Sequence, residues 1–304
     1  SNVTSTPMTL ALTGDEQFAA RRIAADTTHV VATSGSSYQV SVSPSRRVVV
    51  VGASSTSYET GDGVETVALD GGWVFTGSSQ PTGSARFAAI DLTATTPTAH
   101  TVDSGALYSL AVSGNHVFAG GYDSNGGAVF IFDIATRTAP ALLRTVALPF
   151  NVVFYKLLPL GATHLIGISP DADEGGVSHD VVVIDRTDLE ALTVVANVDV
   201  PNFTPLDATL DGTTLYLSGG DDGVVAVDLS DPDTPVIGDR VDTPGVSHGL
   251  AISATHELAV ADGSCGLTFI HTTDINHLIV RGTQSLPGNA YDVAARGGGQ
   301  LAVA

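Results

Sequence analysis

The stretch GGDDGVVAVDLSDPDTPVIGDRVDTPG (residues 219–245) contains a Gly/Asp turn, an apolar run, an Asp-Pro turn and a second, more polar run. The same order returns further along the chain as ADGSCGLTFIHTTDINHLIVRGTQSLPG (261–288). Short runs of Val, Ile, Phe and Ala bounded by Gly, Asp and Pro are typical of β-strands joined by tight turns. The two stretches therefore predict a repeated unit built from strands.

The residues in front of these stretches repeat as well. RIAADTTHVVATSG (22–35) and SLAVSGNHVFAGGY (109–122) match position for position, with an apolar strand, a short polar turn, a histidine and a second apolar strand. The frame occurs seven times, in copies that start near residues 22, 66, 109, 156, 207, 249 and 292. A period of roughly 40–50 residues is typical of proteins built from structural repeats.

The third run of each unit does not alternate between apolar and polar residues. AVFIFDI (128–134), DVVVIDR (180–186) and GVVAVDL (223–229) are apolar at consecutive positions, so both faces of these strands are expected to be buried. A fourth, more polar run ends the unit, as in VIGDRVDTP (236–244). Four strands with a doubly buried interior form the blade of a β-propeller. The sequence therefore predicts an all-β, seven-bladed β-propeller that occupies residues 1–304 as one domain.

The two ends of the chain are expected to close the ring together. The seventh copy has two strands before Ala304, and PMTLALTG (7–14) offers one further strand ahead of the first copy. An N-terminal strand that completes the C-terminal blade would cover both open edges. That blade still lacks a third strand in the sequence. Either the blade is short or the natural chain continues past residue 304, and we favour the second.

Two of the units resemble a known repeat family. LYLSGGDDGVVAVDLSDPDTPVIGDRVDTPG (215–245) and ELAVADGSCGLTFIHTTDINHL (257–278) are similar to the repeats of the bacterial and archaeal LVIVD-repeat proteins. The similarity is weakest in residues 28–62 and 150–201. It implies a propeller outside the cytoplasm, secreted or at the cell surface, and no family-wide catalytic motif. The WD40 signature is missing, because no Trp-Asp pair closes a strand and Trp73 is the only tryptophan.

The charge balance argues against two classes of partner. The chain has 32 Asp and Glu against 12 Lys and Arg, a formal net charge of −20, and Lys156 is its only lysine. Such a surface repels nucleic acid and anionic membranes. No apolar run approaches the roughly 18–20 residues that cross a bilayer. We therefore expect no nucleic-acid partner and no direct insertion into a membrane.

Standard catalytic and nucleotide-binding motifs are not expected in this chain, whether a G-x-S-x-G nucleophile elbow, H-E-x-x-H or a phosphate loop. One acidic loop could hold a metal ion. SPDADEGGVSHD (169–180) offers Asp171, Asp173 and Glu174, whose closely spaced carboxylates suit a Ca²⁺-type ion. The alternative is a solvated acidic loop, because Gly175 occupies the place of a further EF-hand ligand. No other cofactor is predicted.

The residues that open the seven copies form the candidate site. The first strand of each propeller blade lines the central channel, so these residues are expected at one mouth of that channel. They are mostly polar and differ between copies: Arg21, Arg22, Glu65, Thr66, Tyr108, Ser109, Tyr155, Lys156, Leu206, Asp207, His248, Gly249, Tyr291 and Asp292. Ligand sites favour places where polar groups converge from several elements. Alternatively, mixed charges at the mouth pair with one another and hold the blades together.

Two functions are open for this mouth. The first is a recognition or scaffold domain outside the cytoplasm that binds another surface protein or a small polar or anionic ligand. Its contacts would come from Arg21, Arg22, Glu65, Tyr108, Tyr155 and Tyr291. The alternative is a hydrolase or lyase for a small polar or anionic substrate, with His248 as a proton carrier. Its catalytic residues would be Lys156, Asp207, His248 and Asp292. A purely structural segment of a larger surface protein is a third interpretation.

Overall fold

A computed structural model gives the structure of this chain. It describes residues 18–19, 39–43, 47–51, 55–59, 64–79, 86–95, 98–149, 152–170, 179–253, 256–296 and 300–303. The elements in these ranges are the β-strands β1 to β26. Among the described residues there is no helix long and apolar enough to span a membrane.

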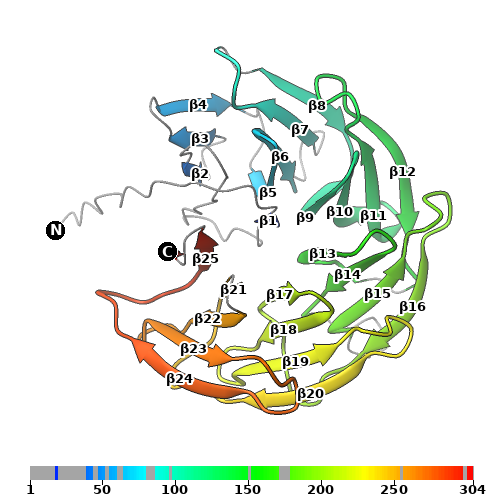
Figure 1. Ribbon diagram of the computed structural model, residues 1–304. Coiled ribbons are helices and arrows are strands. Elements are labelled where there is room, and N and C mark those ends of the chain that lie inside the picture. Colours follow the sequence, from blue (N-terminus) through cyan, green and yellow to red (C-terminus); the bar gives the residue numbers. More distant parts are fainter. Residues whose placement is uncertain are drawn as a thin grey trace.

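The strands form antiparallel sheets that follow one another around a ring (Figure 1). Four sheets are meanders of four strands, with the first strand nearest the centre and the fourth at the circumference. The first two comprise β9 (Ala106–Ser113), β10 (His116–Asp123), β11 (Gly126–Asp133), β12 (Ala141–Ala147), β13 (Lys156–Leu160), β14 (His164–Ile168), β15 (Val181–Asp185) and β16 (Thr193–Val198). The next two comprise β17 (Asp207–Asp211), β18 (Thr214–Ser218), β19 (Val224–Asp228), β20 (Val236–Val241), β21 (Leu250–Ile252), β22 (Glu257–Ala261), β23 (Leu267–His271) and β24 (Ile279–Gln284).

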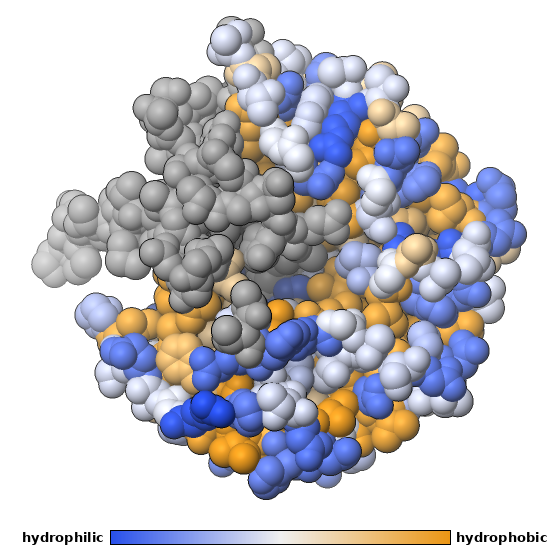
Figure 2. All heavy atoms as spheres, in the orientation of Figure 1, coloured by the Kyte–Doolittle hydropathy of each residue, from blue (hydrophilic) through white to orange (hydrophobic). Residues whose placement is uncertain are grey.

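Three further sheets complete the described part of the ring. One has five strands: β1 (Phe18–Ala19), β5 (Val64–Asp70), β6 (Trp73–Ser78), β7 (Arg86–Asp91) and β8 (Ala99–Asp103). The others comprise β2 (Gln39–Ser43), β3 (Arg47–Val51) and β4 (Ser55–Glu59), and the pair β25 (Val293–Arg296) and β26 (Gln300–Val303). Hydrophilic residues cover much of the described surface on the side shown in Figure 2, and hydrophobic residues are visible between them.

The described strand nearest the N-terminus, β1, joins the five-stranded sheet. It pairs with the innermost strand β5, with Phe18 opposite Leu69. The free edge of β5 carries unpaired backbone groups, and β1 satisfies some of them. Residues 7–14 and the strand pair expected at 22–35 lie outside the described residues, so closure by residues 7–14 stays a prediction.

The third strands are buried on both faces, as predicted. Val224, Val225, Ala226 and Val227 of β19 are each at most 1% exposed. The core consists of layers between neighbouring sheets, and in one of them Ile166 and Val183 pack with Leu217 and Val225 of the next sheet. Burying such side chains contributes about 1.5–3 kcal/mol each.

The opening motif forms the same turn twice. In residues 219–223 the Gly219 N–H donates to Gly223 O at 2.9 Å, and in residues 262–266 the Asp262 N–H donates to Gly266 O at 2.8 Å. Gly223 and Gly266, which end these turns, have φ angles of 72° and 83°. Positive φ angles of this size favour glycine, which explains why both five-residue turns end in glycine.

Aspartates at the ends of third strands cap the turns that follow. Asp228 Oδ1 accepts the N–H of Ser230 at 2.8 Å, two residues further on, as in an Asx turn. The same bond forms at Asp91, Asp133 and Asp185. The Thr187 N–H, helped by the Thr187 hydroxyl, holds the pKa of Asp185 below its ordinary value. Part of the acidic excess is therefore used in turn formation.

We expect Asp228→Ala to lower the free energy of unfolding by about 1 kcal/mol, the usual contribution of one such hydrogen bond. Asp233 is exposed in the same turn and is the matched control, with an expected change within about 0.5 kcal/mol for Asp233→Ala. Urea unfolding of the two variants measures the difference. Equal losses in both would show that the cap at Asp228 is not what stabilises the turn.

Candidate functional site

One end of the ring gathers the chain segments that were expected at the channel mouth. Neighbouring strands in each sheet run in opposite directions. The first strand of each sheet therefore begins at one end of the ring. The turns between second and third strands and the connections between sheets lie at that same end. Two β-bridges join such segments, Gly220 to Ser247 and Gly263 to Ala290. We call this end the mouth face.

Lys156 and Asp207 meet at the mouth face as a buried ion pair. Lys156 Nζ lies 2.6 Å from Asp207 Oδ1, and the two side chains are 11% and 2% exposed. The second oxygen, Asp207 Oδ2, accepts the N–H of Leu250 at 2.9 Å. Asp207 therefore links its own sheet to the preceding sheet through Lys156 and to the following sheet through Leu250. This pair matches the sequence alternative in which mouth charges hold the blades together.

Aromatic side chains from neighbouring sheets also pair at the mouth face. The Tyr108 and Tyr155 rings contact each other edge-on, with centroids 5.9 Å apart. The His248 and Tyr291 rings are tilted, with centroids 5.1 Å apart. Tyr291 is 53% exposed. The structure thus brings the predicted aromatic residues together in two pairs, each of which joins two sheets.

The two remaining described carboxylates of the predicted site make local contacts. Glu65 Oε1 accepts the Ser79 hydroxyl at 2.6 Å. Asp292 Oδ1 accepts the N–H of Val293 at 2.9 Å. Both residues are partly exposed.

The predicted cationic and metal-binding residues Arg21, Arg22, Asp171, Asp173 and Glu174 lie outside the described residues. At the end of the acidic loop, Asp180 is buried and its Oδ2 accepts the N–H of Val200 at 2.7 Å. Within the described ranges, no group of three or more His, Cys, Asp or Glu side chains is arranged to hold a metal ion. The Ca²⁺-type site stays a prediction.

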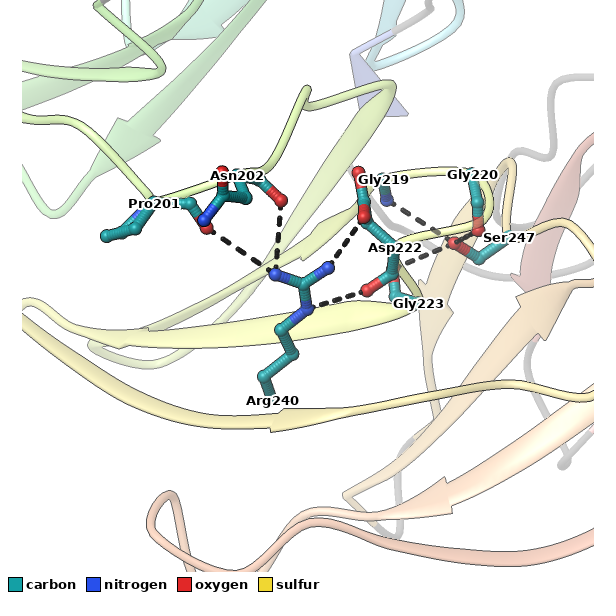
Figure 3. Close-up of polar contacts among 8 residues, drawn as sticks. All are labelled: Pro201, Asn202, Gly219, Gly220, Asp222, Gly223, Arg240 and Ser247. Atoms are coloured by element: carbon teal, nitrogen blue, oxygen red, sulfur yellow. Dashed lines mark hydrogen bonds and ion pairs between the residues drawn. The ribbon is translucent and has the colours of Figure 1, made fainter.

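A nucleophile-elbow string is present after all. GVSHG (245–249) has the G-x-S-x-G spacing, so the expectation that the chain lacks it was wrong. Ser247, however, is fully buried, and its Oγ lies 2.8 Å from Gly223 O and 3.0 Å from Gly220 O (Figure 3). A nucleophile elbow places its serine at an exposed strand-to-helix turn. Ser247 instead fastens the 219–223 turn to the connection that follows β20.

Arg240 secures the other side of the same turn, a role that sequence reasoning missed. Its guanidinium donates to Asp222 O at 2.9 Å and Asp222 Oδ1 at 2.7 Å, and to the Asn202 carbonyl at 3.2 Å (Figure 3). It also lies over the Phe203 ring, 5.5 Å from the centroid. Arg240 thus ties the 219–223 turn to the connection before β17. The positions of these carbonyls depend on tertiary structure, so no local sequence signal marked Arg240.

Solved structures with similar folds identify the architecture. A chain of the mitotic checkpoint complex aligns with a TM-score of 0.68 at 15% identity, over 100% of this chain and 93% of that one. The WD40 β-propeller domain of Doa1 aligns with a TM-score of 0.64 at 13% identity, over 93% of this chain and 91% of that domain. This chain folds as a β-propeller. AztD from Citrobacter koseri aligns at 11% identity with a TM-score of 0.56, over 87% of this propeller and 73% of AztD.

These similarities establish the fold alone, because the identities are low. No family model and no curated protein matches the propeller. The resemblance to LVIVD repeats therefore stays a prediction. The prediction of an all-β propeller is confirmed.

Proposed function

We propose that this propeller is a recognition or scaffold domain that binds another protein through its mouth face, at Tyr291 and His248. The observation that carries the proposal is the exposure of the Tyr291 ring, which is 53% accessible while packed against His248 at the start of a first strand. Tyrosines that are held in place by neighbours and still exposed are typical energetic centres of protein interfaces.

The ionisable residues of the same mouth favour binding over catalysis. Lys156 and Asp207, two of the four residues expected to be catalytic, bind each other in a buried pair. A general acid or base must reach the proton that it transfers. Because Lys156 and Asp207 bind each other and join two sheets, contact with a partner would come from the aromatic and other acidic side chains of the mouth face.

The finer parts of the proposal are a ring of seven blades, membership in the LVIVD-repeat type and a location outside the cytoplasm. Seven copies of the repeat frame support the blade number, and the described strands group into seven sheets. The repeated Asp-Gly and Asp-Pro turns support the repeat type, from which the location follows. Counting the blades in an electron-density map of the protein would test the first of these points.

The binding proposal is testable without a known partner. We would select binders from a displayed library of random linear peptides on the wild-type protein, then measure their affinity for the double variant His248→Ala/Tyr291→Ala. Loss of the central aromatic contact is expected to weaken binding about tenfold or more. The matched control is Leu143→Ala, which removes an exposed apolar side chain from the outer strand β12. Selected peptides that bind both variants like the wild type would refute the proposal.

A further inference from the structure

We propose that the segment recognised by the mouth face is basic, a Lys- or Arg-rich stretch of another protein. This inference rests on the proposed function and names the chemistry of the partner. It applies to a continuous sector of the mouth face, which we call the acidic–aromatic sector. The sector consists of the connections 199–206, 242–249 and 285–292 and the turns 219–223 and 262–266.

The parts of the sector are joined by contacts along its length. Arg240 links the 199–206 connection to the 219–223 turn, and the Gly220–Ser247 bridge links that turn to 242–249. The Thr243 hydroxyl donates to Asp262 Oδ1 at 2.8 Å, which links 242–249 to the 262–266 turn, and the Gly263–Ala290 bridge links that turn to 285–292. The sector is therefore one surface.

Among the residues that the structure describes, no positive charge balances the negative charge of this sector. None of its five segments contains a Lys or Arg. Asp199, Asp221 and Asp242 are exposed, and within the described part of the chain none of them forms an ion pair. Arg240 reaches the sector from β20 but is already paired with Asp222. Other described arginines lie elsewhere, such as Arg137 in a turn between third and fourth strands and Arg281 in the outer strand β24.

Apolar and aromatic groups lie among these carboxylates. Val246 is 38% exposed and lies between the two Gly/Asp turns. Its Cγ1 would lie 3.8 Å from a Cβ added at Gly220, and its Cβ would lie 3.6 Å from a Cβ added at Gly263. Tyr291 is 53% exposed on the neighbouring connection. A guanidinium or ammonium group can lie on the tyrosine ring by cation–π attraction and pair with a carboxylate, while its aliphatic stem covers Val246. An Arg or Lys side chain in a peptide combines these three properties.

The test uses a fluorescein-labelled peptide of alternating Arg and Gly-Ser units, with a peptide in which Glu replaces Arg as the charge control. Binding is measured by fluorescence anisotropy at low salt. We expect Asp221→Asn/Asp242→Asn to raise Kd about fivefold or more, since two carboxylates next to the peptide are lost. Tyr291→Ala should raise Kd about threefold to tenfold, and Tyr291→Phe should stay within about twofold because it keeps the ring.

The matched control is Asp233→Asn/Asp274→Asn, which removes the same charge from two exposed aspartates in turns between third and fourth strands. Its expected Kd lies within about twofold of the wild type. Equal effects of the two double variants would overturn the inference, because the Arg peptide would then respond only to the net charge. If the library yields neutral or acidic peptides that depend on Tyr291, the basic partner is wrong while the proposed function stands. If no library peptide depends on Tyr291, the proposed function itself is wrong.

Discussion

Replacement of Asp207 by alanine is expected to lower the free energy of unfolding by about 3–5 kcal/mol, the usual cost of removing one partner of a buried ion pair. The Lys156 side chain is 11% exposed and would lose the carboxylate that lies 2.6 Å from its Nζ. The Leu250 N–H would lose its acceptor as well. Because three sheets meet at Asp207, unfolding followed by circular dichroism in guanidinium should show one transition at a lower midpoint.

The double variant Lys156→Met/Asp207→Leu is the control for this effect. It removes both charges and keeps apolar volume, so it should recover a large part of the lost stability. In a double-mutant cycle, a coupling free energy near zero between Lys156 and Asp207 would contradict the ion pair. A coupling of about 1.5 kcal/mol or more would agree with it.

Gly223→Ala is the second variant with a large expected effect. Gly223 has a φ angle of 72°, and an added Cβ would approach Val241 O and the Asp242 backbone to less than 3.0 Å. Strain of the backbone and the steric clash together should cost about 2–4 kcal/mol. The loss is measured as a shift in the urea midpoint.

Gly212 offers a control that separates these two causes. Its φ angle is 59°, and a Cβ there would meet nothing within 4 Å. Gly212→Ala should therefore lose only about 1–2 kcal/mol, the cost of the left-handed conformation. If both variants lose the same free energy of unfolding, the close approach of the 219–223 turn to Val241 does not contribute to the loss in Gly223→Ala.

The sequence was sufficient to predict the strand pattern because the local rules agree with one another. The histidines predicted at the turn into the second strand, His116 and His164, begin β10 and β14. The Gly/Asp and Asp-Pro turns lie on either side of β19, as the motif in residues 219–245 predicts. Each of these features depends on residues close in the chain.

Contacts between sheets were harder to predict. The repeat frame brought Lys156 and Asp207 to the same mouth, but it could not decide between a ligand site and a pair that joins sheets. The partner of β1 and the role of Arg240 depend on backbone groups that are distant in the sequence, which no periodicity records. The GVSHG string has the spacing of a nucleophile elbow, but this spacing indicates a catalytic serine only at a strand-to-helix turn. Ser247 lies in a connection between two strands.

If the mouth face recognises a protein partner at Tyr291 and His248, a peptide selected from the library should bind there. A crystal structure of the propeller with such a peptide is the decisive experiment. We expect the peptide to lie across the acidic–aromatic sector, with a basic side chain on the Tyr291 ring. A peptide bound along an outer strand such as β20, or on the turns at the opposite end of the ring, would contradict it.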